Sequence, residues 1–416
     1  MLLHFQSALG ICVIVALAWA LSEDRRAFPW RTVLAGLALQ AALALFLLRV
    51  PLARSALLGL NGAVDALSAA TKAGSGFVFG YVGGGPAPFA VTNPNAMVSF
   101  AFGILPLVLV ISALSALLWH WRILPAIVGA FAFVLRKLMR IGGAVGLGAA
   151  ATIFLGMVEA PLLIRPYLAK LSRAELFILM TVGLASVAGT VFFLYATILA
   201  NVVPEALGHI LIASMMSLPA AILIARIMVP GEAGVETEAA SDLKYRSSMD
   251  AIARGTEDGL KIYLQILAML LVMVALVALA DSILKLLPAV AGAPLSLERV
   301  LGWLFAPLVW LFGVPWQEAP AAGSLMGIKT VLNELVAYLD LAALPPGTLD
   351  PRATLIMVYA MCGFANLGSV GIMIAGLSTL VPERRDEIVP LAMRALVSGT
   401  LASGLTGSMI GLLPVI

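Results

Sequence analysis

Long apolar stretches recur along the whole chain, and they constrain its fold more than any other feature. Of the 416 residues, 62% are hydrophobic and only 11% are charged, whereas soluble domains carry about 25% charged residues. A helix of about 20 apolar residues is long enough to cross a bilayer. The sequence therefore predicts an all-α polytopic membrane protein. The net charge of +3 gives no indication of a nucleic-acid partner.

Apolar runs bounded by charged residues, proline or glycine predict the transmembrane helices. Eight spans are expected, at about 3–21, 30–49, 97–119, 174–200, 206–228, 248–287, 352–378 and 387–414. Amphipathic segments at 51–72, 121–142 and 297–313 are expected to lie along the membrane surface. No basic segment precedes the first apolar run and no small-residue cleavage site follows it, so we interpret that run as a retained span.

Two further segments, 143–171 and 316–345, do not fit a simple span. Each is interrupted by helix-breaking or polar residues beside an acidic one, Glu159 in the first and Glu334 in the second. An acidic residue at membrane depth costs roughly 2.5–3.5 kcal/mol and usually marks function. Irregular backbone is tolerated there only beside a cavity or inside the protein. We therefore predict two re-entrant hairpins that carry a substrate site.

The basic residues of the loops agree with this topology. They gather on one side of the membrane only if both interrupted segments are re-entrant, and the positive-inside rule makes that side cytoplasmic. Both termini are then expected in the periplasm of a bacterial inner membrane. The two hairpins enter from opposite sides, and each precedes a span interrupted by glycine. This order predicts an inverted repeat with its site near the midplane.

The predicted topology divides the chain into four parts. They are 1–142, scaffold-side spans with amphipathic helices; 143–228, the first hairpin with two spans; 229–315, a cytoplasmic loop, the sixth span and an interfacial helix; and 316–416, the second hairpin with the last two spans.

Polar residues of the second hairpin and of the interrupted span after it are candidate ligand-binding groups. An ionised Glu334 only accepts hydrogen bonds and therefore matches a diol. Asn366 and Ser369 are three residues apart and share a helix face. Two structural alternatives remain open, because Glu334 could pair with Lys329 and Asn333 could cap the second arm of its hairpin.

Glu159 in the first hairpin could accept hydrogen bonds from a polar ligand, or it could pair with Arg165. Thr152, Ser186 and nearby carbonyls are oxygen donors suited to sodium, although such hydroxyls often bond to the preceding helical turn. The chain has no phosphate-binding loop, so uphill transport would depend on an ion gradient.

Four motifs give the chain a resemblance to the concentrative nucleoside transporter family. They are Gly76-Phe77-Val78-Phe79-Gly80, Gly156-x-x-Glu159-Ala160-Pro161-Leu162, Gly327-x-Lys329-x-x-x-Asn333-Glu334-x-Val336-Ala337-Tyr338 and Gly363-Phe364-Ala365-Asn366-x-x-Ser369-Val370-Gly371-Ile372. Their order, over nearly the whole chain, is specific. The resemblance implies a homotrimer, an elevator-like movement of the hairpin domain against a trimeric scaffold, and symport of nucleosides with sodium or protons.

The resemblance also implies roles for individual residues. Glu334, Asn366 and Ser369 would hold the ribose hydroxyls, with Glu159 near the nucleobase and Phe364 forming part of the pocket wall. A sodium site, the only cofactor site implied, would involve Thr152, Ser186 and the carbonyl group of Val187.

This chain departs from the family pattern beside the nucleobase. Met157 and Val158 stand where the family has hydrogen-bonding side chains, and Thr152 stands where asparagine is common. The sequence therefore predicts intact ribose recognition with altered base selectivity. Thr152 favours protons over sodium, with Glu159 as the titrating group, but the coupling ion and the choice between purine and pyrimidine stay open.

Three alternatives to a nucleoside symporter remain. One is a carrier for another ribosylated or polyhydroxy compound. Another is a membrane-embedded hydrolase using Glu159 and Glu334 as an acid–base pair, which is disfavoured because no metal-ligand set or nucleophile motif accompanies them. The third is a structural membrane protein. We predict a transporter and not an enzyme.

Overall fold

The computed structural model describes residues 2–91, 99–231, 244–290 and 292–413, and most of them are helical. The loop predicted at 230–247 lies mostly outside the described residues. In the first half, the α-helices are α1 (Leu2–Ala20), α2 (Trp30–Arg49), α3 (Pro51–Phe79), α4 (Leu107–His120), α5 (Ile123–Met139), α6 (Gly143–Ala151), α7 (Glu159–Leu162), α8 (Arg165–Leu168), α9 (Arg173–Ala185), α10 (Gly189–Leu199) and α11 (Ala206–Met228). The second half forms α12 (Ser248–Leu284), α13 (Leu297–Phe312), α14 (Ala319–Val331), α15 (Glu334–Ala343), α16 (Pro351–Met361), α17 (Leu367–Leu380) and α18 (Arg385–Leu412).

The described chain contains seven helical segments that are long and apolar enough to cross a membrane. They correspond to seven of the eight predicted spans and confirm the predicted class of all-helical membrane protein. The remaining span, predicted at 352–378, is divided into α16 and α17, and of these α17 is an apolar helix that is shorter than a full span. The segments 143–171 and 316–345 also consist of helices separated by a break. Irregular backbone therefore occurs where the sequence places acids and glycines.

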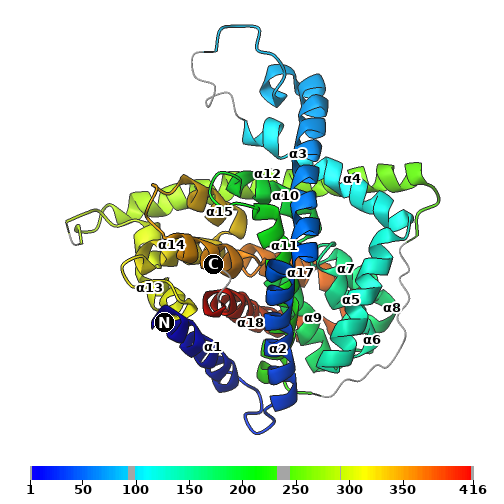
Figure 1. Cartoon of the computed structure of the whole chain (residues 1–416), viewed down its shortest axis with the longest axis vertical. Helices are drawn as coiled ribbons and strands as arrows, with labels where there is room; N and C mark the ends of the chain where they lie inside the picture. Colours follow the sequence, from blue (N-terminus) through cyan, green and yellow to red (C-terminus); the bar gives the residue numbers. More distant parts are fainter. Residues whose placement is uncertain (1, 92–98, 232–243, 291, 414–416) are drawn as a thin grey trace.

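Helix α3 is longer than the sequence predicted, and it extends beyond the other helices (Figure 1). The amphipathic segment expected to end near residue 72 continues to Phe79, through a glycine-rich stretch. The Ser75 hydroxyl donates a hydrogen bond of 2.7 Å to the carbonyl oxygen of Gly83. The chain after α3 therefore folds back over the last turns of the helix, and the glycines permit this close return.

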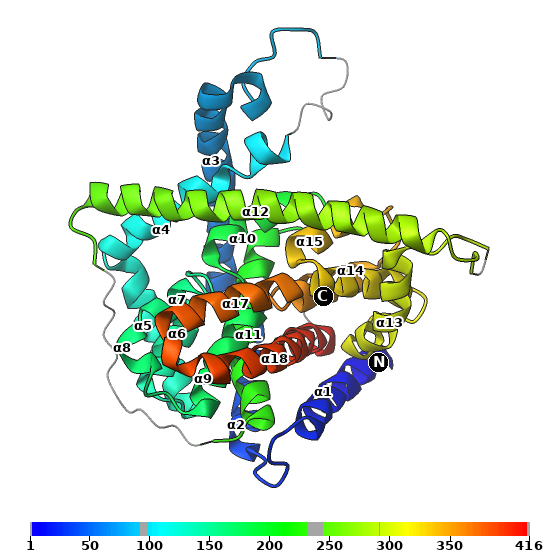
Figure 2. The same ribbon diagram turned by 180° about the vertical axis from the view of Figure 1, so that it is seen from behind.

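Helix α12 crosses the whole molecule on one side (Figure 2) and packs mainly on α4. A Cβ atom on Gly255 would lie 2.7 Å from the carbonyl oxygen of Ser112, and one on Gly259 would lie 2.9 Å from the Ser112 Cβ atom. Small residues at this spacing allow two membrane helices to approach closely. Further along α12, Leu271 and Leu279 are exposed, so this part of the helix has an apolar surface.

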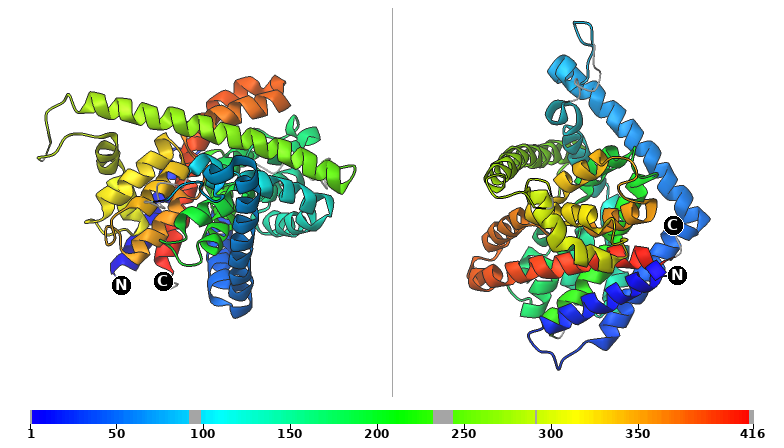
Figure 3. Two further views of the ribbon diagram at one scale, coloured as in Figure 1. Left: turned by 90° about the horizontal axis from the view of Figure 1, so that it is seen from above. Right: turned by 90° about the vertical axis from the view of Figure 1, so that its left-hand side faces the viewer.

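The two ends of the described chain lie close together (Figure 3), because α1 and α18 are packed side by side. The Nδ1 atom of His4 is 3.2 Å from the carbonyl oxygen of Gly411. Arg352 at the start of α16 donates hydrogen bonds to the carbonyl oxygens of Gly313 and Leu3. One guanidinium group thus connects α1, α13 and α16.

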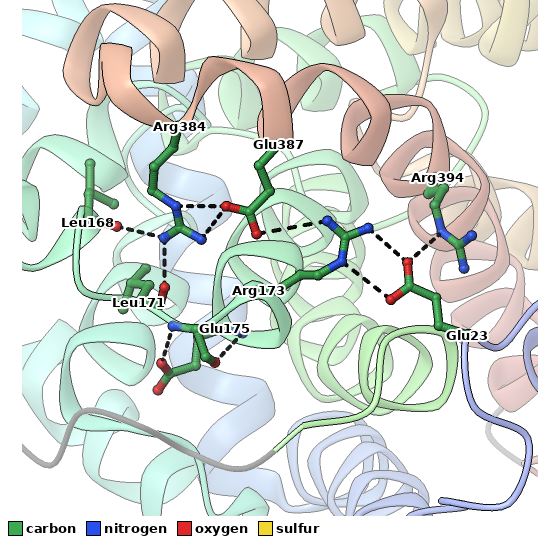
Figure 4. Close-up of polar contacts among 9 residues, drawn as sticks. Glu23, Leu168, Leu171, Arg173, Glu175, Arg384, Glu387 and Arg394 are labelled. Atoms are coloured by element: carbon green, nitrogen blue, oxygen red, sulfur yellow. Dashed lines mark hydrogen bonds and ion pairs between the residues drawn. The ribbon is translucent and has the colours of Figure 1, made fainter.

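Charged side chains join the loop after α1 to α9 and α18 (Figure 4). Arg173, at the start of α9, donates to both carboxylate oxygens of Glu23, at 2.9 and 3.3 Å. Arg384, just before α18, donates to the carbonyl oxygens of Leu168 and Leu171 at 3.0 and 2.7 Å. The end of α8 and the segment after it are therefore bonded to the residue that precedes α18.

The Glu23 pair predicts a defined pH dependence of stability. The hydrogen bond from Arg173 is the main reason why the pKa of Glu23 is lowered from its usual 4.5. A carboxylate with a lowered folded-state pKa stabilises the protein above its unfolded pKa, and this contribution disappears as the pH falls through the folded value. Both side chains are partly exposed, so the contribution is roughly 0–1 kcal/mol.

We expect Glu23→Gln to lower the Tm of the detergent-purified protein at pH 7, and the difference from wild type to shrink below about pH 4.5. Asp24→Asn is the matched control, since Asp24 accepts a hydrogen bond from the backbone N–H of Arg26 in its own loop. A difference that stays constant across the whole pH range would contradict this assignment.

Candidate functional site

The breaks in the interrupted helices meet in the interior of the molecule. The backbone N–H of Phe364, between α16 and α17, donates to the carbonyl oxygen of Ser186, between α9 and α10, at 3.1 Å. Phe154, in the break after α6, lies directly against Gly189 at the start of α10. Residues far apart in the sequence are thereby brought to one place.

A cavity of about 250 Å³ lies at this meeting point, and we call it the central cavity. All eight residues predicted to bind substrate border it: Met157, Val158, Glu159, Asn333, Glu334, Phe364, Asn366 and Ser369. Residues of α4, α10 and α12 also border it, among them Ser112, Tyr195, Asp258 and Gln265, which the sequence pattern did not identify.

Two asparagines begin the helices that follow the breaks in the second half. The Asn333 Oδ1 atom accepts a hydrogen bond of 2.9 Å from the backbone N–H of Val336, and the Asn366 Oδ1 atom accepts one of 2.8 Å from Ser369. Both are therefore N-caps, of α15 and α17. The structural alternative considered for Asn333 is confirmed, and the cap holds its side chain at the edge of the central cavity.

The Glu334 carboxylate is buried, and two side chains hold it. The Tyr195 hydroxyl donates to its Oε1 atom at 2.6 Å, and the Asn366 amide donates to its Oε2 atom at 3.2 Å. Because the Asn366 Oδ1 atom accepts the capping bond, the orientation of that amide is fixed. The carboxylate therefore lies in a defined position beside the central cavity.

The alternative pairing of Glu334 with Lys329 does not occur as a direct contact. Among the described residues, the Lys329 ammonium group has no hydrogen-bond partner and is fully buried. Its charge still acts on Glu334 through space. Likewise, no ion pair joins Glu159 to Arg165 within the described chain; Arg165 is exposed, and the Glu159 carboxylate folds back over Gly156.

Met157 and Val158, in the break between α6 and α7, fit against glycines of neighbouring helices. A Cβ atom on Gly183 of α9 would lie 3.0 Å from the Met157 Cβ atom, and one on Gly376 of α17 would lie 2.8 Å from a Val158 methyl group. The departure from the family pattern is thus accompanied by close apolar packing against α9 and α17.

The residues predicted to bind a cation, Thr152, Ser186 and Val187, are all buried and do not border the central cavity. The Thr152 hydroxyl donates to the Ala149 carbonyl oxygen at 2.6 Å, and Ser186 donates to the preceding turn of α9 in the same way. Both hydroxyl oxygens keep lone pairs, whereas the Val187 carbonyl oxygen accepts a hydrogen bond of 3.5 Å from the Ser214 hydroxyl. Within the described ranges, no three His, Cys, Asp or Glu side chains are grouped to hold a metal ion.

The interrupted membrane helices, and the cavity between them that the buried polar side chains of Glu334, Asn366 and Ser369 border, are typical of a multi-pass membrane transporter. Residues 9–82 and 209–411 match models described as the N-terminus and C-terminus of Na+ dependent nucleoside transporters, and residues 101–202 match a model described as nucleoside recognition. The chain belongs to the concentrative nucleoside transporter family, as the motifs predicted.

Individual relatives match over almost the whole chain. The nucleoside permease NupC of Helicobacter pylori is 36% identical, over 98% of this chain and 97% of its own. The sodium/nucleoside cotransporter 1 of Rattus norvegicus is 31% identical over 97% of this chain and 63% of its own length. The structure of CNTnw in an inward-facing substrate-bound state has a TM-score of 0.89 at 36% identity, covering 98% of both chains. A structure of a CNTnw variant in an outward-facing state has a TM-score of 0.91 at 35% identity, covering 99% of this chain and 97% of that one.

Proposed function

We propose that this chain is a cation-coupled symporter that imports nucleosides across a bacterial inner membrane. The observation that carries the proposal is the buried Glu334 carboxylate, held by Asn366 with Ser369 beside it. An ionised acceptor in a buried position suits the paired hydroxyl groups of a ribose. The relatives named as nucleoside transporters favour this substrate over another polyhydroxy compound.

The mechanism that we propose is an elevator-type movement within a homotrimer. CNTnw has been solved in inward-facing and outward-facing states, which supports alternating access in this relative. In this chain, the two hairpin units, 143–228 and 316–416, would move against residues 1–142 and 229–315. Both hairpins would be re-entrant, and both termini would be periplasmic.

The coupling ion is sodium or a proton. The oxygens of Thr152, Ser186 and Val187 could hold sodium, and a titrating Glu159 could carry a proton. Uptake of labelled nucleosides into proteoliposomes, first with sodium removed at fixed pH and then with pH varied at fixed sodium, separates the two. Recovery of the nucleoside unchanged separates a carrier from a hydrolase, and accumulation without either gradient would contradict symport.

Base selectivity is expected to depend on the first hairpin. Met157→Gln with Val158→Thr restores two hydrogen-bonding side chains of nearly unchanged size. Each new bond contributes about 0.5–1.5 kcal/mol. The ratio of the affinities for purine and pyrimidine nucleosides should therefore be roughly 2–100-fold larger in the double variant than in the wild type. The measurement is competition for uptake by a panel of nucleosides.

Met393→Gln, which changes an exposed methionine of α18, is the control and should leave the ranking unchanged. The hypothesis fails if the wild type is already sharply selective for one base and no substitution in the first hairpin alters that selectivity.

A further inference from the structure

Tyr195 is a residue without a role in the sequence motifs, yet it makes the shortest hydrogen bond to the proposed ribose-binding carboxylate. It lies on α10, 2% exposed, and its hydroxyl donates to the Glu334 Oε1 atom at 2.6 Å. An ionised carboxylate can only accept, so the hydroxyl must be the donor. Building on the function proposed above, we propose that Tyr195 is a positioning residue that sets the orientation of Glu334 toward the two ribose hydroxyls.

The two hydrogen bonds to Glu334 leave acceptor capacity on its carboxylate. Tyr195 donates to one oxygen and Asn366 to the other. A carboxylate has about four lone-pair sites, so each oxygen can still accept a bond from the cavity side. Two neighbouring acceptors, one on each oxygen, match the two donors of a vicinal diol. Without the hydrogen bond from Tyr195, the Glu334 carboxylate can rotate about its last side-chain torsion. Its two oxygens then no longer match the two hydroxyl groups of the diol.

Tyr195 and Glu334 also come from different halves of the chain. Tyr195 lies in the unit that begins with the first hairpin, whereas Glu334 and Asn366 lie in the unit that begins with the second. The bond therefore makes ribose recognition by one unit depend on a helix of the other.

Tyr338 provides a matched control for Tyr195. The two rings lie against each other, with centroids 5.1 Å apart, and Tyr338 is also fully buried. The Tyr338 hydroxyl donates to the carbonyl oxygen of Val358 at 2.8 Å, and the residue does not border the central cavity. Replacing either tyrosine by phenylalanine removes one hydroxyl group from the same pair of rings. Only Tyr195→Phe removes a hydrogen bond to Glu334.

The test is the affinity of purified wild type, Tyr195→Phe and Tyr338→Phe for adenosine, uridine and their 2′-deoxy and 3′-deoxy analogues. Tyr195→Phe is expected to weaken ribonucleoside binding by about tenfold or more and to weaken binding of the deoxy analogues less. Discrimination between ribose and deoxyribose should therefore fall. Tyr338→Phe should leave that discrimination at the wild-type value, and Tyr195→His, which keeps a donor, should restore part of it.

Each result has a definite meaning. Equal weakening of all compounds by Tyr195→Phe, or no weakening, overturns the positioning role while the proposed function stands. If the wild type binds neither adenosine nor uridine, the proposed function fails and the positioning role fails with it. Should Tyr195→Phe not fold, Tyr195→His takes its place: discrimination between ribose and deoxyribose below that of Tyr338→Phe supports the role, because the donor is then displaced, and discrimination equal to that of Tyr338→Phe overturns it.

Discussion

Glu334→Gln is expected to reduce nucleoside uptake at least about 100-fold while leaving the protein folded. Hydrogen bonds to a charged group contribute about 1.5–3 kcal/mol each, and the proposed ribose contact involves two of them. Glutamine has nearly the same shape and can still accept from Tyr195, but it lacks the charge and one of the acceptor atoms. The loss should therefore appear in substrate affinity, measured by uptake and by equilibrium binding.

Asp340→Asn is the control for this change. Asp340 lies on the same helix, α15, and does not border the central cavity. The Asp340→Asn variant should transport nucleosides as fast as the wild type does. Normal uptake by Glu334→Gln would instead favour the structural alternative, in which the acid only supports the fold.

Gly363→Ala is expected to have the second large effect, through packing rather than ligand contact. Gly363 lies where the break between α16 and α17 crosses the break between α9 and α10. An added Cβ atom would lie 2.7 Å from the Ala185 carbonyl oxygen, and backbone atoms cannot move aside easily. Overpacking of a buried site costs about 1–3 kcal/mol, so we expect a lower Tm in detergent and a strong loss of uptake.

Gly371→Ala tests whether this effect is local. Gly371 belongs to the same motif, but a Cβ atom there meets nothing within 4 Å, and alanine has the higher helix propensity. The variant should be as stable as the wild type. Equal destabilisation by both substitutions would show that the motif, and not the crossing of the two breaks, is sensitive to the loss of glycine.

The sequence was sufficient to predict the helical membrane class and most polar residues of the central cavity. Acids stand out inside apolar runs because a charged side chain is costly at membrane depth, and clustered glycines indicate places where a helix can break. The length of α3 was mispredicted, since glycine weakens a helix locally and the return of the chain onto Ser75 is a tertiary contact. Tyr195 could not be found by spacing, because a tyrosine in an apolar span gives a weak signal.

Some residues of the central cavity depend entirely on long-range packing. Asp258 and Gln265 border it because α12 lies close to α4 at Gly255 and Gly259, and no local pattern predicts that contact. The packing of Met157 and Val158 on glycines of α9 and α17 is equally non-local. The sequence identified these two residues as unusual, and only the fold explains where their side chains fit.

The bonds from Arg384 to the carbonyl oxygens of Leu168 and Leu171 have a mechanical consequence. They connect the end of α8 and the segment after it to the start of α18, while Tyr195 of α10 donates to Glu334 of α15 in the interior. Residues 143–228 and residues 316–416 are thus bonded to each other at two separate places. Displacing one of these segments relative to the other would break both sets of bonds, so we expect the two segments to move together.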